Sequence, residues 1–250
     1  SVTFGKAVEE IGPGAFKGSF SADSASIIIP GSIKKLDTGV FENCKKLVEV
    51  IFEEGGTFET LSDNTFNGCS ALASVTIPSN VITISNSAFN ECNSLKKLII
   101  ADNDTELALP ESLGTAPIES VYLGRKISGI SFTGSQTLTS LSLGDVYTEI
   151  GEGAYKGCPK LAAVKMPAVT TIGASAFENC AALVSISIDS VTSIGTSALA
   201  GTALTAATLS DSITAVPDSL FRNCAALAAV NMPAVTTIGL SAFEGCAALV

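Results

Sequence analysis

Seven cysteines are the side chains in this sequence with the widest possible chemistry, because thiols can form disulfides or bind metals. They are Cys44, Cys69, Cys92, Cys158, Cys180, Cys224 and Cys246. All seven follow an aromatic residue by three positions, and Ser, Ala or Thr stands at the same place in other copies of a repeat. We therefore predict small, buried side chains with free thiols. A disulfide between neighbouring copies is the alternative, although parallel Cβ vectors on stacked coils suit its torsion angle poorly.

Two acidic segments are the other candidates for chemistry. Asp102, Asp104 and Glu106 alternate along one segment and could indicate calcium ligation. The segment lacks the glycine and the bidentate glutamate of an EF-hand loop, so we predict a solvated turn and no metal site. A second cluster, which we expect to keep a sheet face soluble rather than to bind a specific partner, comprises Glu49, Glu53, Glu54 and Glu59.

The composition excludes several classes of function. The 250 residues include no histidine, so a Ser-His-Asp or Cys-His site is impossible. A net charge of -10 with only 14 lysine and arginine residues argues against a nucleic-acid interface, which needs clustered positive charge. No run of about 18 apolar residues is present that could insert into a membrane. We expect a protein that is not an enzyme and that uses no cofactor.

A repeated pattern must position these side chains. An aromatic residue or a leucine returns about every 22 to 25 positions, which is typical of a solenoid rather than of a globular domain. Alignment on this column gives eleven copies: Phe16, Phe41, Phe66, Phe89, Leu113, Phe132, Tyr155, Phe177, Leu199, Phe221 and Phe243. Stacked copies should bury these side chains in one column, because no copy could bury them alone.

Each copy contains a strand and a turn. The segments Leu72 to Pro78 and Leu161 to Pro167 end in alternating apolar residues, which predicts a strand with one buried face that stops at proline. A Val-Thr-x-Ile-Gly segment, such as residues 169–173, then bends at its glycine. Ser175 and Ser241 stand just before the next Ala-Phe pair and predict a cap for one short helical or 3₁₀ turn.

The copies differ in regularity along the chain. From residue 155 to 250 the period is a constant 22, whereas in residues 1–154 the spacing varies. Leu113 and Ala116 replace the aromatic residue and the cysteine in the weakest stretch, residues 101–134. We predict a single solenoid of about eleven coils over residues 1–250. Both ends fall inside a repeat, so we expect a fragment of a longer array or ends that something else caps.

The combined pattern Leu-x-x-Val-x-Ile-Pro-x-x-Val-Thr-x-Ile-Gly-x-x-Ala-Phe-x-x-Cys resembles the BspA-type leucine-rich repeat over essentially the whole chain. The resemblance implies a right-handed leucine-rich-repeat solenoid with a parallel sheet along its concave face. It also implies a bacterial protein, secreted or displayed on the cell surface, with a role in adhesion. The family motif contains no catalytic residue, so the matching residues here are structural.

The positions that project from the main strand should form the concave face. Most of them are small or carry a hydroxyl group, which favours a solvated face. The candidate partner-binding residues are Lys97, Ile99, Tyr122 and Arg125, because large aromatic and arginine side chains dominate interface hot spots. We predict a non-catalytic recognition or adhesion module that binds a host or microbial surface protein or a glycan. The alternative is a structural spacer or stalk that presents other domains.

Overall fold

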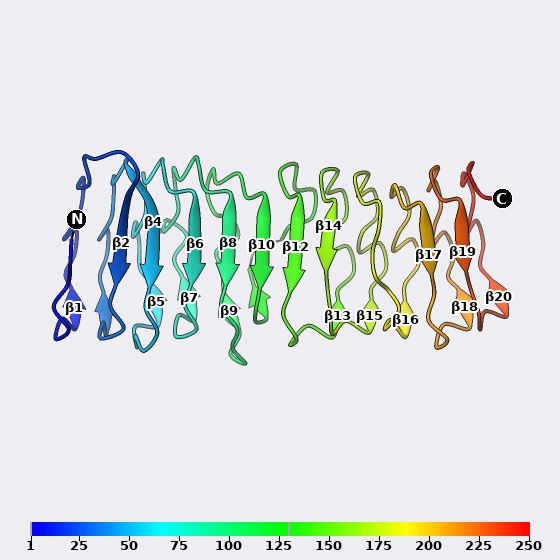
Figure 1. Ribbon diagram of the computed structural model, residues 1–250, viewed down its shortest axis with the longest axis horizontal. Coiled ribbons are helices and arrows are strands. Elements are labelled where there is room, and N and C mark those ends of the chain that lie inside the picture. Colours follow the sequence, from blue (N-terminus) through cyan, green and yellow to red (C-terminus); the bar gives the residue numbers. More distant parts are fainter. Residues whose placement is uncertain (1, 130) are drawn as a thin grey trace. The chain divides into compact units, whose positions relative to one another are not determined.

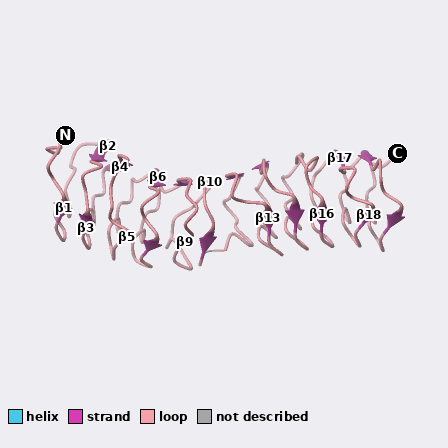
Figure 2. Ribbon diagram, turned by 90° about the horizontal axis from the view of Figure 1, so that it is seen from below, coloured by secondary structure: helices cyan, strands magenta, loops and turns pink. Residues whose placement is uncertain are grey.

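The computed structural model describes residues 2–129 and 131–250 and divides the chain into two compact units, Ser1–Ile130 and Ser131–Val250. Both units consist of turns of a parallel β-solenoid, about ten in total, which is close to the predicted number of coils. The described residues contain twenty short strands and no helix, so no membrane-spanning helix is found among them (Figure 1, Figure 2). That residues 1–250 form one uninterrupted domain stays a prediction.

From β2 (Ala25–Ile29) onward, each turn of the first unit gives one strand to a main parallel sheet and one minor strand to a second, smaller sheet. The main sheet contains, in spatial order, β2, β4 (Leu47–Phe52), β6 (Ser74–Ile77), β8 (Lys97–Ile100) and β10 (Ser120–Leu123). The minor strands are β1 (Glu10–Ile11) with β3 (Lys35–Leu36), and β5 (Thr60–Leu61), β7 (Thr83–Ile84), β9 (Leu107–Ala108) and β11 (Ile127–Ser128). Val75, Leu98 and Val121 lie side by side in the core because their strands pair in register.

The second unit repeats this arrangement with shorter main strands. Its main strands pair as β12 (Ser140–Leu143) with β14 (Ala163–Lys165) and as β17 (Ala206–Thr208) with β19 (Ala229–Asn231). Its minor strands are β13 (Glu149–Ile150), β15 (Thr171–Ile172) and β16 (Ser193–Ile194), and β18 (Ala215–Val216) with β20 (Thr237–Ile238). Residues 183–188 occupy the same repeat position but form no strand, although Leu183 and Ile188 are buried as the strand pattern predicts.

The aromatic residues form the predicted buried column in each unit. In the first unit the rings of Phe16, Phe41, Phe66 and Phe89 stack with successive centroid distances of 5.6, 5.5 and 5.4 Å. In the second unit Tyr155 stacks on Phe177 at 5.6 Å, and Phe221 stacks on Phe243 at 5.5 Å. Leu199 replaces a ring between these two pairs in the sequence. All seven cysteines occupy one position beside the column.

The prediction of a capped helical or 3₁₀ turn before the aromatic residue is wrong. Ser175, Ser197 and Ser241 have φ values of 54, 57 and 53°, in the left-handed region, whereas a helix cap has extended backbone. The amide of Ser175 donates to Thr196 O of the next coil at 2.9 Å, and the amide of Phe177 donates to Ala198 O at 2.9 Å. The left-handed residues therefore direct alternate amides toward the neighbouring coil instead of into a helix.

A second left-handed position lies immediately before the cysteine. Asn179 and Gly201 occupy it with φ values of 61 and 68°, which explains why Asn and Gly predominate there. A Cβ atom on Gly201 would lie 2.5 Å from Asn179 Oδ1 of the preceding coil, so the asparagine side chain occupies the space above the glycine. Gly68 and Asn43 of the preceding coil are arranged in the same way: a Cβ atom on Gly68 would lie 2.4 Å from Asn43 Oδ1.

Candidate functional site

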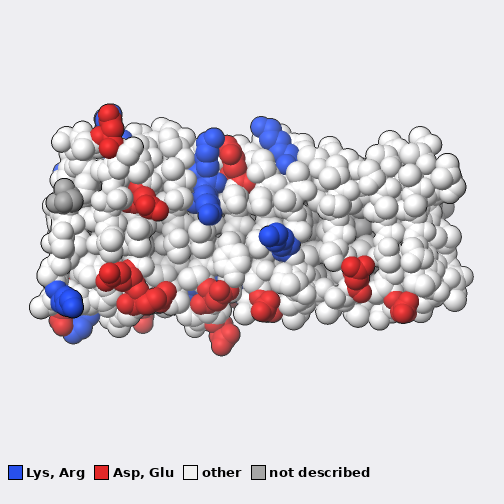
Figure 3. All heavy atoms as spheres, viewed as in Figure 1, with Lys and Arg blue, Asp and Glu red and all other residues white. Residues whose placement is uncertain are grey.

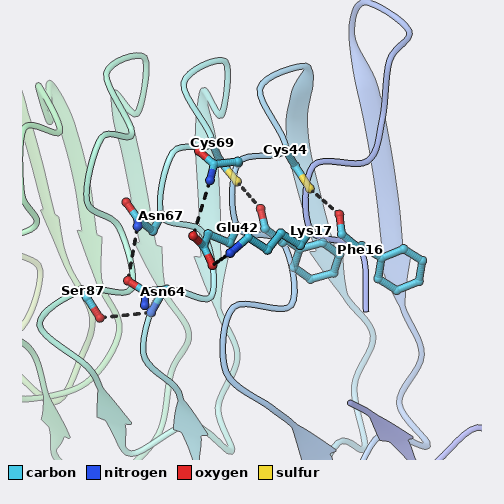
Figure 4. A network of polar contacts seen from close by, with 10 residues as sticks. Phe16, Lys17, Glu42, Cys44, Asn64, Asn67, Cys69 and Ser87 are labelled. Carbon is cyan, nitrogen blue, oxygen red and sulfur yellow. Dashed lines mark hydrogen bonds and ion pairs between the residues drawn. The ribbon is translucent and has the colours of Figure 1, made fainter. Parts of the chain in front are cut away.

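The cysteines are free thiols that donate hydrogen bonds between coils. Figure 4 shows Cys44 Sγ directed at Phe16 O and Cys69 Sγ at Phe41 O, each at 3.0 Å. In the second unit Cys180 Sγ lies 3.2 Å from Tyr155 O. Six cysteines are buried and Cys246 is half-buried, which confirms the predicted free thiols. The sequence did not reveal the hydrogen bond, although the Ser and Thr substitutes in this column are also donors.

Burial keeps the thiols of Cys92 and Cys180 protonated. It raises the pKa of Cys92 and of Cys180 to about 12. Because the thiolate is the nucleophile and the metal ligand, neither side chain is reactive near neutral pH. The cysteine row contributes packing and hydrogen bonds between coils.

The acidic segment after β8 is an ordered turn. The amide of Thr105 donates to Asn103 Oδ1 at 2.7 Å, and Asn103 Nδ2 donates to Ser79 O at 2.9 Å. Asp102, Asp104 and Glu106 are exposed. Among residues 2–129 and 131–250 there is no group of three or more Cys, Asp or Glu side chains that could hold a metal ion.

The main strands of the first unit expose a row of large side chains. Ile28 of β2 lies opposite Ile51 of β4, and Thr76 of β6 lies opposite Ile99 of β8, which lies opposite Tyr122 of β10. Ile28 and Ile51 are 50% and 42% exposed, and Ile99 and Tyr122 are half-buried. We call these five residues the Ile-Tyr row.

Three of the four predicted binding residues come together on this face. Lys97 lies two residues before Ile99 on the same side of β8, opposite Ser74 and Ser120 of the adjacent strands. Sequence analysis did not select Ile28, because the run Ile27–Ile29 hides the alternation of buried and exposed positions. The signal was its place two residues before Pro30, as Thr76 stands two residues before Pro78.

The placement of Arg125 on this face is wrong. Its side chain is fully buried, and its Nη1 and Nη2 atoms donate to Ser79 O and Pro78 O, each at 3.0 Å. These carbonyl groups lie two coils earlier in the chain, so Arg125 ties three successive coils together. Burial lowers the pKa of the guanidinium group. Arg125 is therefore a structural residue. Its side chain is long enough to reach the carbonyl groups of Pro78 and Ser79.

Tyr122 is held by a neighbouring side chain. Its hydroxyl group donates to Asp102 Oδ1 at 2.6 Å, across from β10 to the turn after β8. Gly124, which stands where other repeats have proline, leaves room for this contact, because a Cβ atom there would lie 2.6 Å from Asp102 Oδ1. This hydrogen bond therefore holds the half-exposed ring of Tyr122 in place.

The corresponding face of the second unit is composed of small and polar side chains. Its outward strand positions carry Ser140 and Ser142, Ala163 and Lys165, Ala206 and Thr208, and Ala229 and Asn231. Large apolar side chains are missing from these positions. The second unit therefore presents a hydrophilic sheet face where the first presents the Ile-Tyr row.

Comparison with known proteins places these features in a family. A family model described as BspA type Leucine rich repeat region matches residues 1–109 and 125–250 in 6 copies. A solved leucine-rich repeat protein from Bacteroides ovatus is similar at 23% identity with a TM-score of 0.49; the match covers 100% of this chain and 65% of that chain. A leucine rich cell surface protein from Faecalibacterium prausnitzii is similar at 20% identity with a TM-score of 0.37, over 100% of this chain and 84% of that chain. No curated protein matches the chain.

Proposed function

The chain belongs to the BspA-type leucine-rich repeat family, and we propose that it is a non-catalytic recognition module, secreted or displayed on the cell surface, that binds protein or glycan partners. Leucine-rich repeats are generally non-enzymatic, and here the thiols are buried and the sequence has no histidine. Membership of the family supports the surface location. Adhesion to host or microbial surfaces is the role that this reading favours.

The observation that carries the proposal is the Ile-Tyr row. Isolated exposed apolar side chains are common, but large apolar side chains that adjoin on successive strands indicate an interaction surface. Ile28 and Ile51 adjoin on β2 and β4, and Ile99 adjoins Tyr122 on β8 and β10. Solenoids use such extended sheet faces for binding, because outward positions do not contribute to the shared core.

A structural spacer is the second candidate function, and the second unit favours it. Its outward strand residues, among them Ser142 and Thr208, lack the large side chains that act as anchors in interfaces. A chain with this face alone would be expected to remain solvated and to present other domains at a distance.

Adhesion of coated particles tests recognition against the spacer role. Fluorescent latex beads that carry the full chain would be incubated with cultured epithelial cells and with intact bacteria, and bound beads would be counted by flow cytometry. We expect more binding than with albumin-coated beads, and competition by the free chain. Protease or glycosidase treatment of the cells would then separate protein partners from glycan partners. Binding at the level of albumin on every surface would contradict recognition and support the spacer.

A further inference from the structure

We propose that the partner of the first unit is a cationic amphipathic helix that lies across the main strands with its apolar side on the Ile-Tyr row. The inference rests on the recognition function proposed above and specifies its partner. The row supplies the apolar contact, the spacing of the strands selects a helix, and the acidic border of the face selects positive charge.

The spacing between neighbouring side chains of the row is closer to the pitch of a helix than to the side-chain repeat of an extended chain. Parallel strands lie about 4.8 Å apart, so a segment that crosses them meets a new side chain at that interval. A helix presents a side chain to one face once per turn of about 5.4 Å. An extended chain presents one about every 6.8 Å. Across the four intervals from β2 to β10 the mismatch is about 2.4 Å for a helix and about 8 Å for an extended chain.

The face is acidic along the edge where the main strands end. Glu53 and Glu54 follow β4, and Asp102, Asp104 and Glu106 follow β8; all five are exposed. Figure 3 shows acidic side chains along the lower border of this face and basic side chains higher on it. Lys97 lies on the side of the row away from the acidic border. Lysine or arginine on the flank of a bound helix would lie against this border, whereas a helix with acidic flanks would be repelled.

Tyr122 provides the fixed anchor at one end of the row. Its hydroxyl group donates a hydrogen bond to Asp102 Oδ1 at 2.6 Å, so its ring is held in place while it remains half-exposed. Aromatic side chains that are rigid before binding are preferred anchors of interfaces. Ile28 and Ile51 supply the apolar contact at the opposite end, on β2 and β4.

Three synthetic peptides test the proposal with the full chain. The first is an 18-residue helix of about equal leucine and lysine content with all leucines on one side; the second replaces every lysine with glutamate; the third alternates leucine and lysine, which disfavours a helix. Fluorescence anisotropy of the labelled peptides would give Kd. We expect the first peptide to bind at least about tenfold more tightly than either of the others at low salt. Added salt should weaken it.

Variants locate the binding site. Ile51→Ser combined with Ile99→Ser should weaken the first peptide at least about tenfold, because it removes apolar contact from two strands. Ser142→Ala combined with Thr208→Ala, at the same strand positions of the second unit, is the matched control and should leave Kd unchanged. Glu54→Lys combined with Asp104→Lys keeps the row intact and should reverse the preference toward the glutamate peptide. Thermal unfolding followed by circular dichroism would verify that each variant is folded.

Several results would overturn the proposal: equal affinity for the lysine and glutamate peptides, tighter binding of the alternating peptide, or equal losses in the variants of the two units. The bead assay separates this failure from failure of the proposed function. Beads that carry Ile51→Ser with Ile99→Ser and still adhere like wild type would overturn the partner assignment while recognition stands. Wild-type beads that never adhere would overturn recognition, even if the peptide binds.

Discussion

The two units share one set of buried positions but expose different side chains. In the first unit the main strands present Ile28, Ile51, Ile99 and Tyr122, whereas in the second unit the same strand positions carry Ser142, Lys165, Thr208 and Asn231. Inside, both units stack aromatic rings and bond cysteine thiols to carbonyl groups of the preceding coil. The repeat therefore specifies the inward residues, and the outward residues are free to differ between units.

Removing a ring from the aromatic column should cause the largest loss of stability, and the loss should be greater in the first unit. Phe66 stacks on rings on both sides, at 5.5 and 5.4 Å, whereas Phe177 stacks on Tyr155 and is followed in the column by Leu199. Each change to alanine should cost about 3–5 kcal/mol, with about 1 kcal/mol more for Phe66→Ala because of its second ring pair. Urea unfolding followed by circular dichroism measures the difference. An equal cost in both units would show that stacking adds nothing to burial.

The chain has two arginines, one in each unit. Replacing each by alanine should lower the free energy of unfolding by very different amounts. Arg125→Ala removes a buried guanidinium group from Ser79 O and Pro78 O and should cost about 2–4 kcal/mol. Arg222→Ala, at an exposed site of the second unit, is the control and should cost less than about 0.5 kcal/mol. Urea unfolding followed by circular dichroism would measure both costs. A small cost for Arg125→Ala would mean that the three coils it joins are held by their strands alone.

Replacing the glycine before the cysteine position by alanine should destabilise both units for the same steric reason. Gly68 and Gly157 stand before a cysteine, and Gly201 stands before Thr202, which replaces it. Gly68→Ala and Gly201→Ala combine a left-handed backbone with a Cβ that would lie 2.4 and 2.5 Å from an asparagine oxygen. Gly157 has the same backbone, but a Cβ there would meet nothing nearer than 3.7 Å. We expect about 1–2 kcal/mol for Gly157→Ala, from the backbone alone, and a larger loss for the other two. Thermal melts would rank them, and equal losses would refute the steric rule.

The buried part of this fold could be predicted because its pattern repeats. Phe177, Cys180 and Leu183 recur at fixed spacing and are all buried. Ser175 was misjudged because serine is a common helix cap and an uncommon left-handed residue, so its local preference indicated the wrong turn. The Asn or Gly before every cysteine except Cys92 was the available signal for the left-handed backbone, since asparagine tolerates this conformation better than most residues.

The surface was harder to predict because it does not repeat. Ile28 lies in a run of three isoleucines whose alternation becomes visible only when β2 pairs with β4. Arg125 follows a strand closely and was expected at the surface, but its side chain is long enough to reach carbonyl groups two coils away. Contacts of this kind depend on the three-dimensional stacking of coils with different insertions. Position within a repeat is therefore a better guide to the buried residues than to the outward face.

The smallest effect should come from an ion pair that both units share at one repeat position. Lys17 Nζ lies 2.8 Å from Glu42 Oε2 in the first unit, and Lys156 Nζ lies 2.8 Å from Glu178 Oε2 in the second (Figure 4 shows the first pair). The lysines are largely exposed, so Lys17→Ala and Lys156→Ala should each cost less than about 1 kcal/mol, and less still in high salt. A clear difference between them would show that the surroundings of this shared ion pair differ between the two units.

The stabilisation from the Lys156–Glu178 pair should also depend on pH and be lost in acid. Burial opposes ionisation of Glu178, but hydrogen bonds from Lys156 and Ser175 outweigh it and hold the pKa of this carboxyl group below its usual value. A lowered pKa stabilises the fold above the pKa of the unfolded chain, and this stabilisation is lost as pH falls through the folded pKa. The cost of Lys156→Ala should therefore be larger at pH 7 than at pH 2. Unfolding free energies at the two pH values measure it, and a cost that persists in acid would mean that Lys156 acts through packing of its aliphatic chain rather than through its charge.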